Sequence, residues 1–308
     1  MRVIRADVLG MCFGVRDALA VIERIGDPGS VTIHGQLVHN EVVLDDLKAR
    51  GFANRGEADR WKQAEGEPAR LSVLITAHGI SDRRRRALET SGKHLIDTTC
   101  PLVHRVHQAA QSLQAEGYHV LVIGRAGHVE VQGIVEDLSS VDVIESESQV
   151  GHYEHPKLGI VCQTTATERQ VAAIRGAIAR QNPDAEIRFI DTVCLPTKEH
   201  QRSLARLIEQ VDAVVVVGGW NSNNTRELAE LCRERGCPVL RVQSAADLEP
   251  DWFQGYAKVG LTAGTSTLDR TIDEVHRALV WIGTHDTGAI PVSSQNHGAL
   301  LAGASVSA

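Results

Sequence analysis

The chain has 308 residues and a net charge of −7, and only 4% of its residues are aromatic. This acidic balance and the shortage of aromatic side chains argue against broad binding of nucleic acids or anionic membranes. The longest purely apolar run, at 213–217, is far shorter than the roughly 20 residues of a membrane span, and the first ten residues have no signal-peptide core. We therefore expect a cytoplasmic protein that binds neither nucleic acid nor membrane.

Short runs rich in β-branched residues alternate along the chain with amphipathic segments of helical length. Strands are predicted at 31–34, 71–77, 119–123, 158–162, 187–190, 211–217, 238–242 and 258–262. Helices are predicted to begin near Val15, Glu41, Ser81, Pro101, Val129, Thr167, Leu195, Thr225 and Thr267. This alternation predicts an α/β protein with parallel sheets, in which strand carboxyl ends and helix amino termini face the ligand.

A weak internal repeat divides the chain into three parts. The pattern D-T-x-C occurs at 97–100 and again at 191–194, each time before a predicted helix, and Cys12 precedes a predicted helix in the same way. The three cysteines are nearly evenly spaced, which predicts three similar α/β units. We place these units at residues 14–97, 98–192 and 193–285. Residues 1–13 would complete the third unit, and 286–308 would form a C-terminal tail.

The six cysteines fall into two groups. Cys162, Cys232 and Cys237 lie within or beside apolar elements and are expected to be packing residues. The other three, Cys12, Cys100 and Cys194, stand at helix amino termini, where the helix dipole is expected to lower the thiol pKa. Three converging thiolates could bind zinc or an iron-sulfur cluster. Zinc usually uses local C-x-x-C pairs, which are absent here, whereas scattered ligands can hold a cluster.

Histidine and small polar residues mark further candidate positions. His39, His78 and His128 each stand near glycine after a predicted strand, which favours one shared site. The segments 221–225 (NSNNT) and 262–266 (TAGTS) each open a helix, where Ser, Thr and Asn act as N-caps. The same positions offer backbone N–H, hydroxyl and amide donors to an anion, and together with the histidines they would suit a compact diphosphate.

Motifs for nucleotide cofactors are missing. The sequence contains no G-x-G-x-x-G, no phosphate-binding loop of the G-x-x-x-x-G-K-[ST] type and no G-x-S-x-G. The arginine run at 83–86 is expected to be the solvated start of a helix.

Taken in chain order, these motifs resemble the 4-hydroxy-3-methylbut-2-enyl diphosphate reductase family, the iron-sulfur enzymes that end the non-mevalonate isoprenoid pathway. The motifs that carry the resemblance are CFGV at 12–15, VHN at 38–40, AHG at 77–79, TCPLV at 99–103, GHVEVQG at 127–133, QTT at 163–165, DTVC at 191–194, NSNN at 221–224 and TAGTS at 262–266. They extend over nearly the whole predicted folded part of the chain.

The resemblance implies a trefoil of three α/β units around one central 4Fe-4S cluster. Cys12, Cys100 and Cys194 would be its ligands, which leaves one iron open to the allylic hydroxyl of the substrate. The positions that match the diphosphate site are His39, His78, His128, Ser222, Asn223, Asn224 and Ser266, of which Asn223 stands where a second serine is common. Glu130 matches the proton-delivering carboxyl group, and Thr164 the hydroxyl that binds this group and the substrate.

The implied reaction is the reductive dehydroxylation of the substrate to isopentenyl and dimethylallyl diphosphate, with electrons from a ferredoxin or flavodoxin. The chain departs from the family pattern at 8–11 (VLGM), at Arg125 in the loop GRAGH, at Asn223 and at 267–268 (TL). Two alternatives remain at this point. One is a related iron-sulfur reductase or dehydratase for another allylic or phosphorylated substrate, and the other is a cluster-binding sensor without enzymatic activity. The pairing of Glu130 with Thr164 favours an enzyme, because a sensor needs no proton path.

Overall fold

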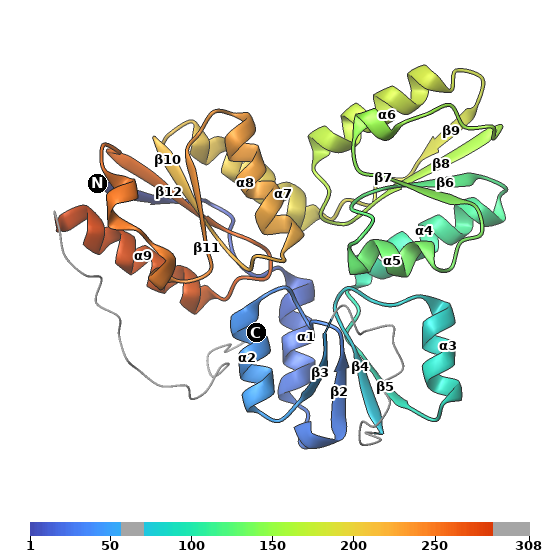
Figure 1. Cartoon of the computed structure of the whole chain (residues 1–308), viewed down its shortest axis with the longest axis horizontal. Coiled ribbons are helices and arrows are strands. Elements are labelled where there is room, and N and C mark those ends of the chain that lie inside the picture. The colour runs from blue at the N-terminus through green and yellow to red at the C-terminus, as the bar shows by residue number, and fades with distance from the viewer. Residues whose placement is uncertain (57–70, 286–308) are drawn as a thin grey trace, which may run out of the picture.

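The computed structural model describes residues 1–56 and 71–285, so the tail predicted at 286–308 lies outside the described residues. Its secondary structure alternates strands with helices, as the sequence predicts, and the observed strands form three separate four-stranded parallel sheets (Figure 1). Each predicted helix begins within a few residues of its expected position.

The first sheet consists of the second to fifth strands of the chain. Its elements and the flanking helices are α1 (Phe13–Glu23), β2 (Val31–His34), α2 (Glu41–Ala49), β3 (Ala53–Arg55), β4 (Ser72–Ile75), α3 (Asp82–Thr90) and β5 (His94–Asp97). The strands are ordered β3-β2-β4-β5, and all neighbouring pairs are parallel.

The second sheet repeats this order with β7-β6-β8-β9, again with parallel pairs throughout. Its elements and the flanking helices are α4 (Pro101–Ala115), β6 (His119–Ile123), α5 (Val129–Val135), β7 (Val141–Ile144), β8 (Lys157–Cys162), α6 (Glu168–Gln181) and β9 (Glu186–Phe189).

The third sheet joins the two ends of the described chain. Its elements and the flanking helices are β1 (Arg2–Arg5), α7 (Leu195–Ile208), β10 (Ala213–Val217), α8 (Asn223–Glu234), β11 (Val239–Val242), β12 (Lys258–Ala263) and α9 (Asp269–Thr284). The order is β11-β10-β12-β1, with Arg2 opposite Lys258. The strand order is therefore the same in all three sheets, with β1 in the place that β5 and β9 occupy in the others. The exact boundaries of the three units at 97/98 and 192/193 stay predictions.

The central strands of each sheet carry the apolar cores. All five residues of β10 are buried, as are all five of β6, because helices cover both faces of these parallel strands. Four observed strands have no counterpart among the predicted strand ranges, namely β1, β3, β5 and β7. Each is an edge strand of three or four residues that includes at least one polar residue, and most of these residues are at least partly exposed. Such strands lack the apolar run that identifies a buried strand.

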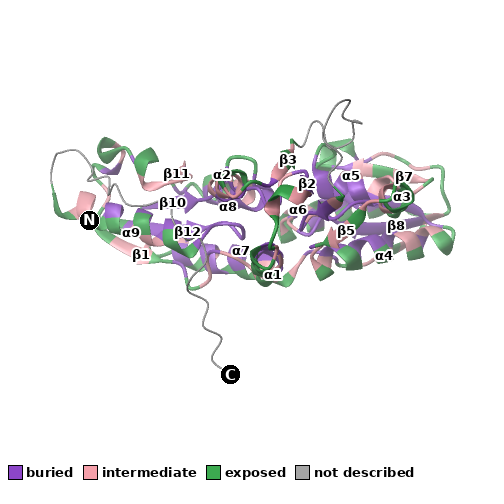
Figure 2. Cartoon of the chain, turned by 90° about the horizontal axis from the view of Figure 1, so that it is seen from below, coloured by how far each residue is buried: buried purple, intermediate pink, exposed green. Residues whose placement is uncertain are grey.

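The helices are distributed over two faces of a flattened molecule. Figure 2 shows α1, α4 and α7 along one face, and α2, α5 and α8 along the other. Helices of the first set follow the fourth strands of the sheets, and helices of the second set follow the central strands β2, β6 and β10. No helix within the described residues is long and apolar enough to cross a membrane.

The arginine run predicted to be solvated connects the first two sheets instead. Arg83 and Arg84 in the first turn of α3 form ion pairs with Glu136, which ends α5, at 3.0 and 2.8 Å. The hydroxyl of Ser81 donates to the same carboxylate at 2.6 Å. The Glu136 carboxylate thus gathers three donors from the first sheet, which is why this part of the run is not simply solvated.

Candidate active site

Every side chain that the sequence analysis assigned to a site lines one cavity. The shared strand order explains this convergence, because loops after equivalent strands meet at the same place in each sheet. The fourth strands β1, β5 and β9 lead to Cys12, Cys100 and Cys194. The central strands β2, β6 and β10 lead to His39, His128 and Ser222, and the third strands β4, β8 and β12 lead to His78, Thr164 and Ser266.

The three cysteines occupy equivalent N-cap positions of α1, α4 and α7, and none of them makes a side-chain capping hydrogen bond. Their residues are partly buried, whereas Cys162, Cys232 and Cys237 are buried in apolar clusters, as expected for packing residues. The three thiols also stand close to other groups of the site. A Cβ atom on Gly14 would lie 2.6 Å from the Cys100 Sγ, and the Cys194 thiol donates to Thr197 at 3.0 Å.

The expectation of a lowered thiol pKa is wrong for the protein alone. Burial raises the pKa of Cys12 and Cys100 and raises that of Cys194 to about 11, and these effects exceed those of the helix backbone N–H groups that lower it. Desolvation of the thiolate therefore outweighs the helix dipole. A bound cation reverses this balance because it deprotonates a coordinating thiol.

The three cysteines are not among the compact ligand groups of the described residues. The group found there consists of His39, His78 and His128, whose ligand atoms lie within 4.8 Å of one another. Sulfur ligands around a single tetrahedral zinc ion are about 3.8 Å apart, given Zn–S bonds of about 2.3 Å. Because the three thiols line one cavity without forming such a compact group, they fit a multinuclear cluster better than one zinc ion.

The imidazoles of His39, His78 and His128 form a compact group on the cavity wall. The ring centroids of His39 and His78 are 4.3 Å apart, and His128 lies 5.3 Å from the first and 5.7 Å from the second. His39 Nδ1 contacts Gln36 Oε1 at 2.8 Å, and His128 Nδ1 accepts from the backbone N–H of Glu130 at 3.2 Å. These contacts orient the rings of His39 and His128.

The amino terminus of α8 and the loop before α9 provide neutral polar groups. Ser222 caps α8 by accepting from Thr225 N–H at 3.3 Å, which confirms the N-cap predicted in this segment. Asn224 Oδ1 accepts from Thr265 N–H at 3.0 Å, while its buried Nδ2 has no partner within the described part of the chain. A buried amide donor without a partner is costly, and a ligand in the cavity can satisfy it.

Glu130, in the first turn of α5, is almost completely buried and is held by a single residue. Thr164 donates its backbone N–H to Glu130 Oε1 at 2.6 Å and its hydroxyl to Oε2 at 2.7 Å. Burial raises the pKa of Glu130 to about 7, although the two bonds from Thr164 lower it. The carboxyl group therefore keeps its proton to a much higher pH than an exposed glutamate does, which suits a proton donor.

The cavity attracts anions without lysine or arginine. Among the described residues that line it, Glu130 is the only carboxyl group, and no Lys or Arg is present. Helices α1, α4, α5, α7 and α8 all begin at N-cap residues on the cavity wall. Their positive dipole ends and exposed N–H groups create a site for a negatively charged ligand.

Sequence reasoning missed three residues that support this site. The Thr197 hydroxyl accepts a hydrogen bond from the Cys194 thiol, and Thr165 follows Thr164 on the cavity wall. Asn40 caps α2 and donates its Nδ2 to the Ser266 carbonyl at 2.7 Å, which ties the first sheet to the third. Thr197 could have been found, because position i+3 lies on the same helix face as the cysteine. Nothing in the sequence pairs Asn40 with Ser266.

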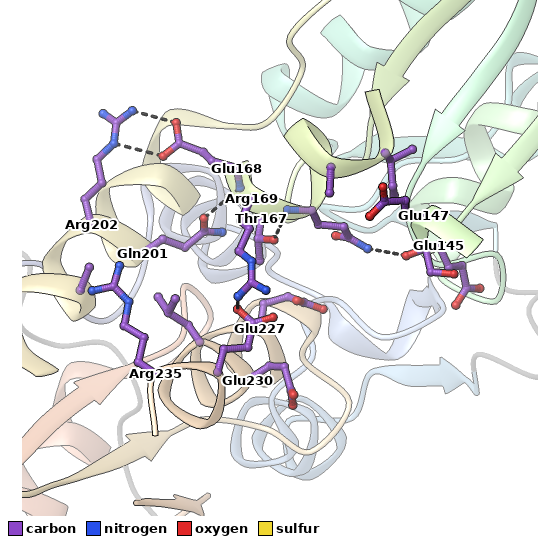
Figure 3. Close-up of a pocket in the computed structure, with 17 residues that line it drawn as sticks. Glu145, Glu147, Thr167, Glu168, Arg169, Gln201, Arg202, Glu227, Glu230 and Arg235 are labelled. Atoms are coloured by element: carbon purple, nitrogen blue, oxygen red, sulfur yellow. Dashed lines mark hydrogen bonds and ion pairs between the residues drawn. The ribbon is translucent and has the colours of Figure 1, made fainter. Parts of the chain in front are cut away.

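A second, larger cavity of ≈ 600 Å³ lies where α6, α7 and α8 meet (Figure 3). Exposed ion pairs cross it, among them Arg202 with Glu168 at 2.8 Å. None of the cysteines or histidines of the candidate site lines it. Its mixed charges and its open position provide no grouping of catalytic side chains, so we place the chemistry in the central cavity.

Three thiols, three imidazoles and a buried carboxyl group thus line one cavity to which all three parallel sheets contribute, an arrangement suited to a metal-dependent or cluster-dependent site. Comparison with known proteins identifies the family. The model of the LytB protein family matches residues 3–280, and the chain belongs to this family.

Relatives and solved structures agree with this assignment. Proteins named 4-hydroxy-3-methylbut-2-enyl diphosphate reductase from Methylibium petroleiphilum and Aquifex aeolicus are each 35% identical to the chain. The first alignment covers 91% of this chain and 85% of its relative, and the second covers 89% and 94%.

The structure of the Plasmodium falciparum reductase superimposes with a TM-score of 0.81 at 25% identity, covering 91% of this chain and 88% of that one. Another structure of a reductase of this name gives 0.62 at 33% identity, covering 91% and 100%. The predicted family and the α/β trefoil are thereby confirmed.

Proposed function

We propose that the protein reduces 4-hydroxy-3-methylbut-2-enyl diphosphate to isopentenyl and dimethylallyl diphosphate. The observation that carries the proposal is that one cavity contains three thiols at helix N-cap positions, a wall of helix amino termini that attracts anions, and a buried carboxyl group with a pKa of about 7. Removal of an allylic hydroxyl group as water requires two electrons and two protons. The cavity therefore has to hold an electron-transfer group, an anionic substrate and a proton donor together.

Cys12, Cys100 and Cys194 would hold a 4Fe-4S cluster. Two observations support this assignment: the three cysteines occupy N-cap positions, and among the described residues they do not form a compact single-ion group. When bound, the cluster would supply electrons one at a time and an iron without a protein thiolate that acts as a Lewis acid. A one-electron carrier of the ferredoxin or flavodoxin type is the proposed source of these electrons.

The protein's own residues bind the substrate and supply a proton. His39, His78 and His128, with Ser222, Asn224 and Ser266, would bind the diphosphate at the helix amino termini. Glu130 would give its proton to the leaving hydroxyl group, and Thr164 holds the carboxyl group in place. Because Glu130 is almost completely buried, its carboxyl group is shielded from bulk water, which favours transfer of the proton to a bound substrate.

Anaerobic turnover of the substrate tests the proposal directly. Protein reconstituted with iron and sulfide should oxidise a reduced viologen dye only when 4-hydroxy-3-methylbut-2-enyl diphosphate is added, and both isomeric products should appear. Iron-loaded protein that leaves this substrate unchanged would contradict the proposed reaction. A panel of other allylic and phosphorylated substrates would then identify a related reductase, whereas inactivity on the whole panel would favour a sensor.

The pH dependence of turnover should follow the Glu130 carboxyl group. Only the protonated form can donate, and burial raises its pKa to about 7, so the protonated fraction falls as pH rises through this value. We expect kcat to decrease about tenfold per pH unit well above the pKa. Steady-state assays over roughly pH 6 to 9 measure this limb, and a flat profile would mean that another group supplies the proton.

The close contact between Gly14 and Cys100 gives a test of the cluster ligands. In Gly14→Ala the new methyl group would lie 2.6 Å from Sγ, so Cys100 must move away from its position on the cavity wall. We expect at least ~10-fold weaker cluster retention, the range seen when residues around a metal site are disturbed. Gly176→Ala is the matched control, because this helical glycine meets only the flexible end of Arg180. Equal iron contents in both variants would argue against Cys100 as a ligand.

A further inference from the structure

Asn223 stands between two residues of the proposed diphosphate site, yet its amide group is directed to other partners. Its Nδ2 donates to the Thr165 hydroxyl oxygen at 2.8 Å, and its Oδ1 accepts from Arg226 Nη2 at 2.7 Å. The residue is buried at the start of α8. Because both ends of the amide have partners of the correct polarity, its orientation is fixed.

Thr165, which accepts the hydrogen bond from Asn223, belongs to the loop that holds Glu130. Thr165 follows Thr164, which binds both carboxylate oxygens of Glu130. Gln163 Nε2 also donates to the Thr165 hydroxyl oxygen, at 3.1 Å, and Gln163 Oε1 accepts from Arg125 N–H at 3.0 Å. The loop between β8 and α6 is thus held by its own sheet on one side and by α8 of the third sheet on the other.

We propose that Asn223 is a positioning residue that couples diphosphate binding at the amino terminus of α8 to the placement of Glu130. A diphosphate bound by Ser222 and Asn224 restrains the first turn of α8, and Asn223 transmits this restraint through Thr165 to Thr164. The inference rests on the proposed function and extends it. It also replaces the substrate-binding role expected for Asn223 from the sequence.

The reach of the side chain explains why asparagine suits this position. The Nδ2 atom lies two bonds beyond Cβ, whereas a serine hydroxyl lies only one bond beyond it. Starting from 2.8 Å, a side chain shorter by one bond would place its donor more than ~3.5 Å from the Thr165 hydroxyl, outside hydrogen-bond range. Serine would also leave Arg226 without its acceptor on residue 223. Asn223→Ser therefore removes the link while keeping a residue suited to a diphosphate site.

Hydrogen exchange at the Thr164 amide measures the coupling without turnover, because this N–H bonds to Glu130. In the cluster-loaded wild-type protein, inorganic diphosphate should slow exchange of this amide at least ~10-fold, since the restraint suppresses local opening. In Asn223→Ser the protection should disappear, while the diphosphate Kd changes less than ~3-fold because Ser222 and Asn224 remain. Arg202→Ala is the matched control. It removes another contact between the same two sheets, the Arg202–Glu168 pair of Figure 3, and should retain the protection.

Steady-state kinetics supply the second measurement. Asn223→Ser and Thr165→Val should each lower kcat about tenfold with little change in KM. Thr165→Val also removes the hydrogen bond from Gln163, so the double variant should be no worse than Thr165→Val alone, because both lack the Asn223–Thr165 link. Retained Thr164 protection with weakened diphosphate binding in Asn223→Ser would overturn the inference and make Asn223 a ligand. Failure of wild-type protein to bind diphosphate would overturn both proposals. Normal coupling in a wild-type protein that does not turn over the substrate would overturn only the proposed reaction.

Discussion

Glu130→Gln should bind diphosphate and retain iron as the wild-type protein does, yet lose turnover by about 10²- to 10⁴-fold, the usual contribution of a positioned acid. Glutamine preserves the shape of the side chain. Its Oε1 can accept the Thr164 N–H, and its Nε2 can donate to the Thr164 hydroxyl, which then reverses its own direction. The variant therefore keeps the buried contact and removes only the transferable proton.

Three measurements on the same preparation separate this role from a structural one. Iron content and calorimetric titration with inorganic diphosphate should match the wild-type values, whereas viologen oxidation should nearly cease. Glu234→Gln is the control, because this exposed carboxylate pairs with Arg169 outside the cavity, and it should be fully active. Near-normal turnover in Glu130→Gln would refute the proton-donor role. A loss of diphosphate affinity in this variant would assign Glu130 to binding instead.

Much of the fold follows from local patterns in the sequence. The all-buried strands β6 and β10 appear as continuous β-branched runs, and the helix starts are marked by residues such as Ser81 and Thr167, which cap α3 and α6 as expected. Short strands such as β3 are not detected by this reasoning, because three residues with partly exposed side chains form no apolar run.

The candidate site could be predicted because each residue stands in a recurrent local position. A cysteine, histidine or small polar residue after a strand is conspicuous in every unit, and parallel sheets bring such positions together. The contacts between units could not be predicted in this way. Nothing in the sequence pairs Asn223 with Thr165, or Arg84 with Glu136, because each pair depends on how two sheets are placed relative to one another. Thiol pKa also depends on burial, which the helix-terminus argument neglects.

Cys194→Ser should lose most of its iron and, with it, its turnover. Serine keeps the N-cap position. Its hydroxyl can donate to Thr197, which in the wild-type protein accepts from the Cys194 thiol. The local structure is therefore retained, while a hydroxyl group, which deprotonates much less readily than a thiol, replaces the proposed iron ligand. We expect at least ~100-fold weaker cluster retention, because even residues that only support a metal ligand contribute roughly 10- to 100-fold.

Cys237→Ser is the matched control for Cys194→Ser. Cys237 is buried in an apolar cluster before β11, does not line the central cavity, and donates its thiol to the Pro238 carbonyl at 3.7 Å. Iron analysis and the cluster's visible absorbance should give wild-type values for this variant. A full iron content in Cys194→Ser would place the ligand elsewhere, and equal losses in both variants would indicate a damaged fold. Because Glu130→Gln leaves the thiols intact and Cys194→Ser leaves the carboxyl group intact, the two variants together distinguish loss of proton supply from loss of the cluster.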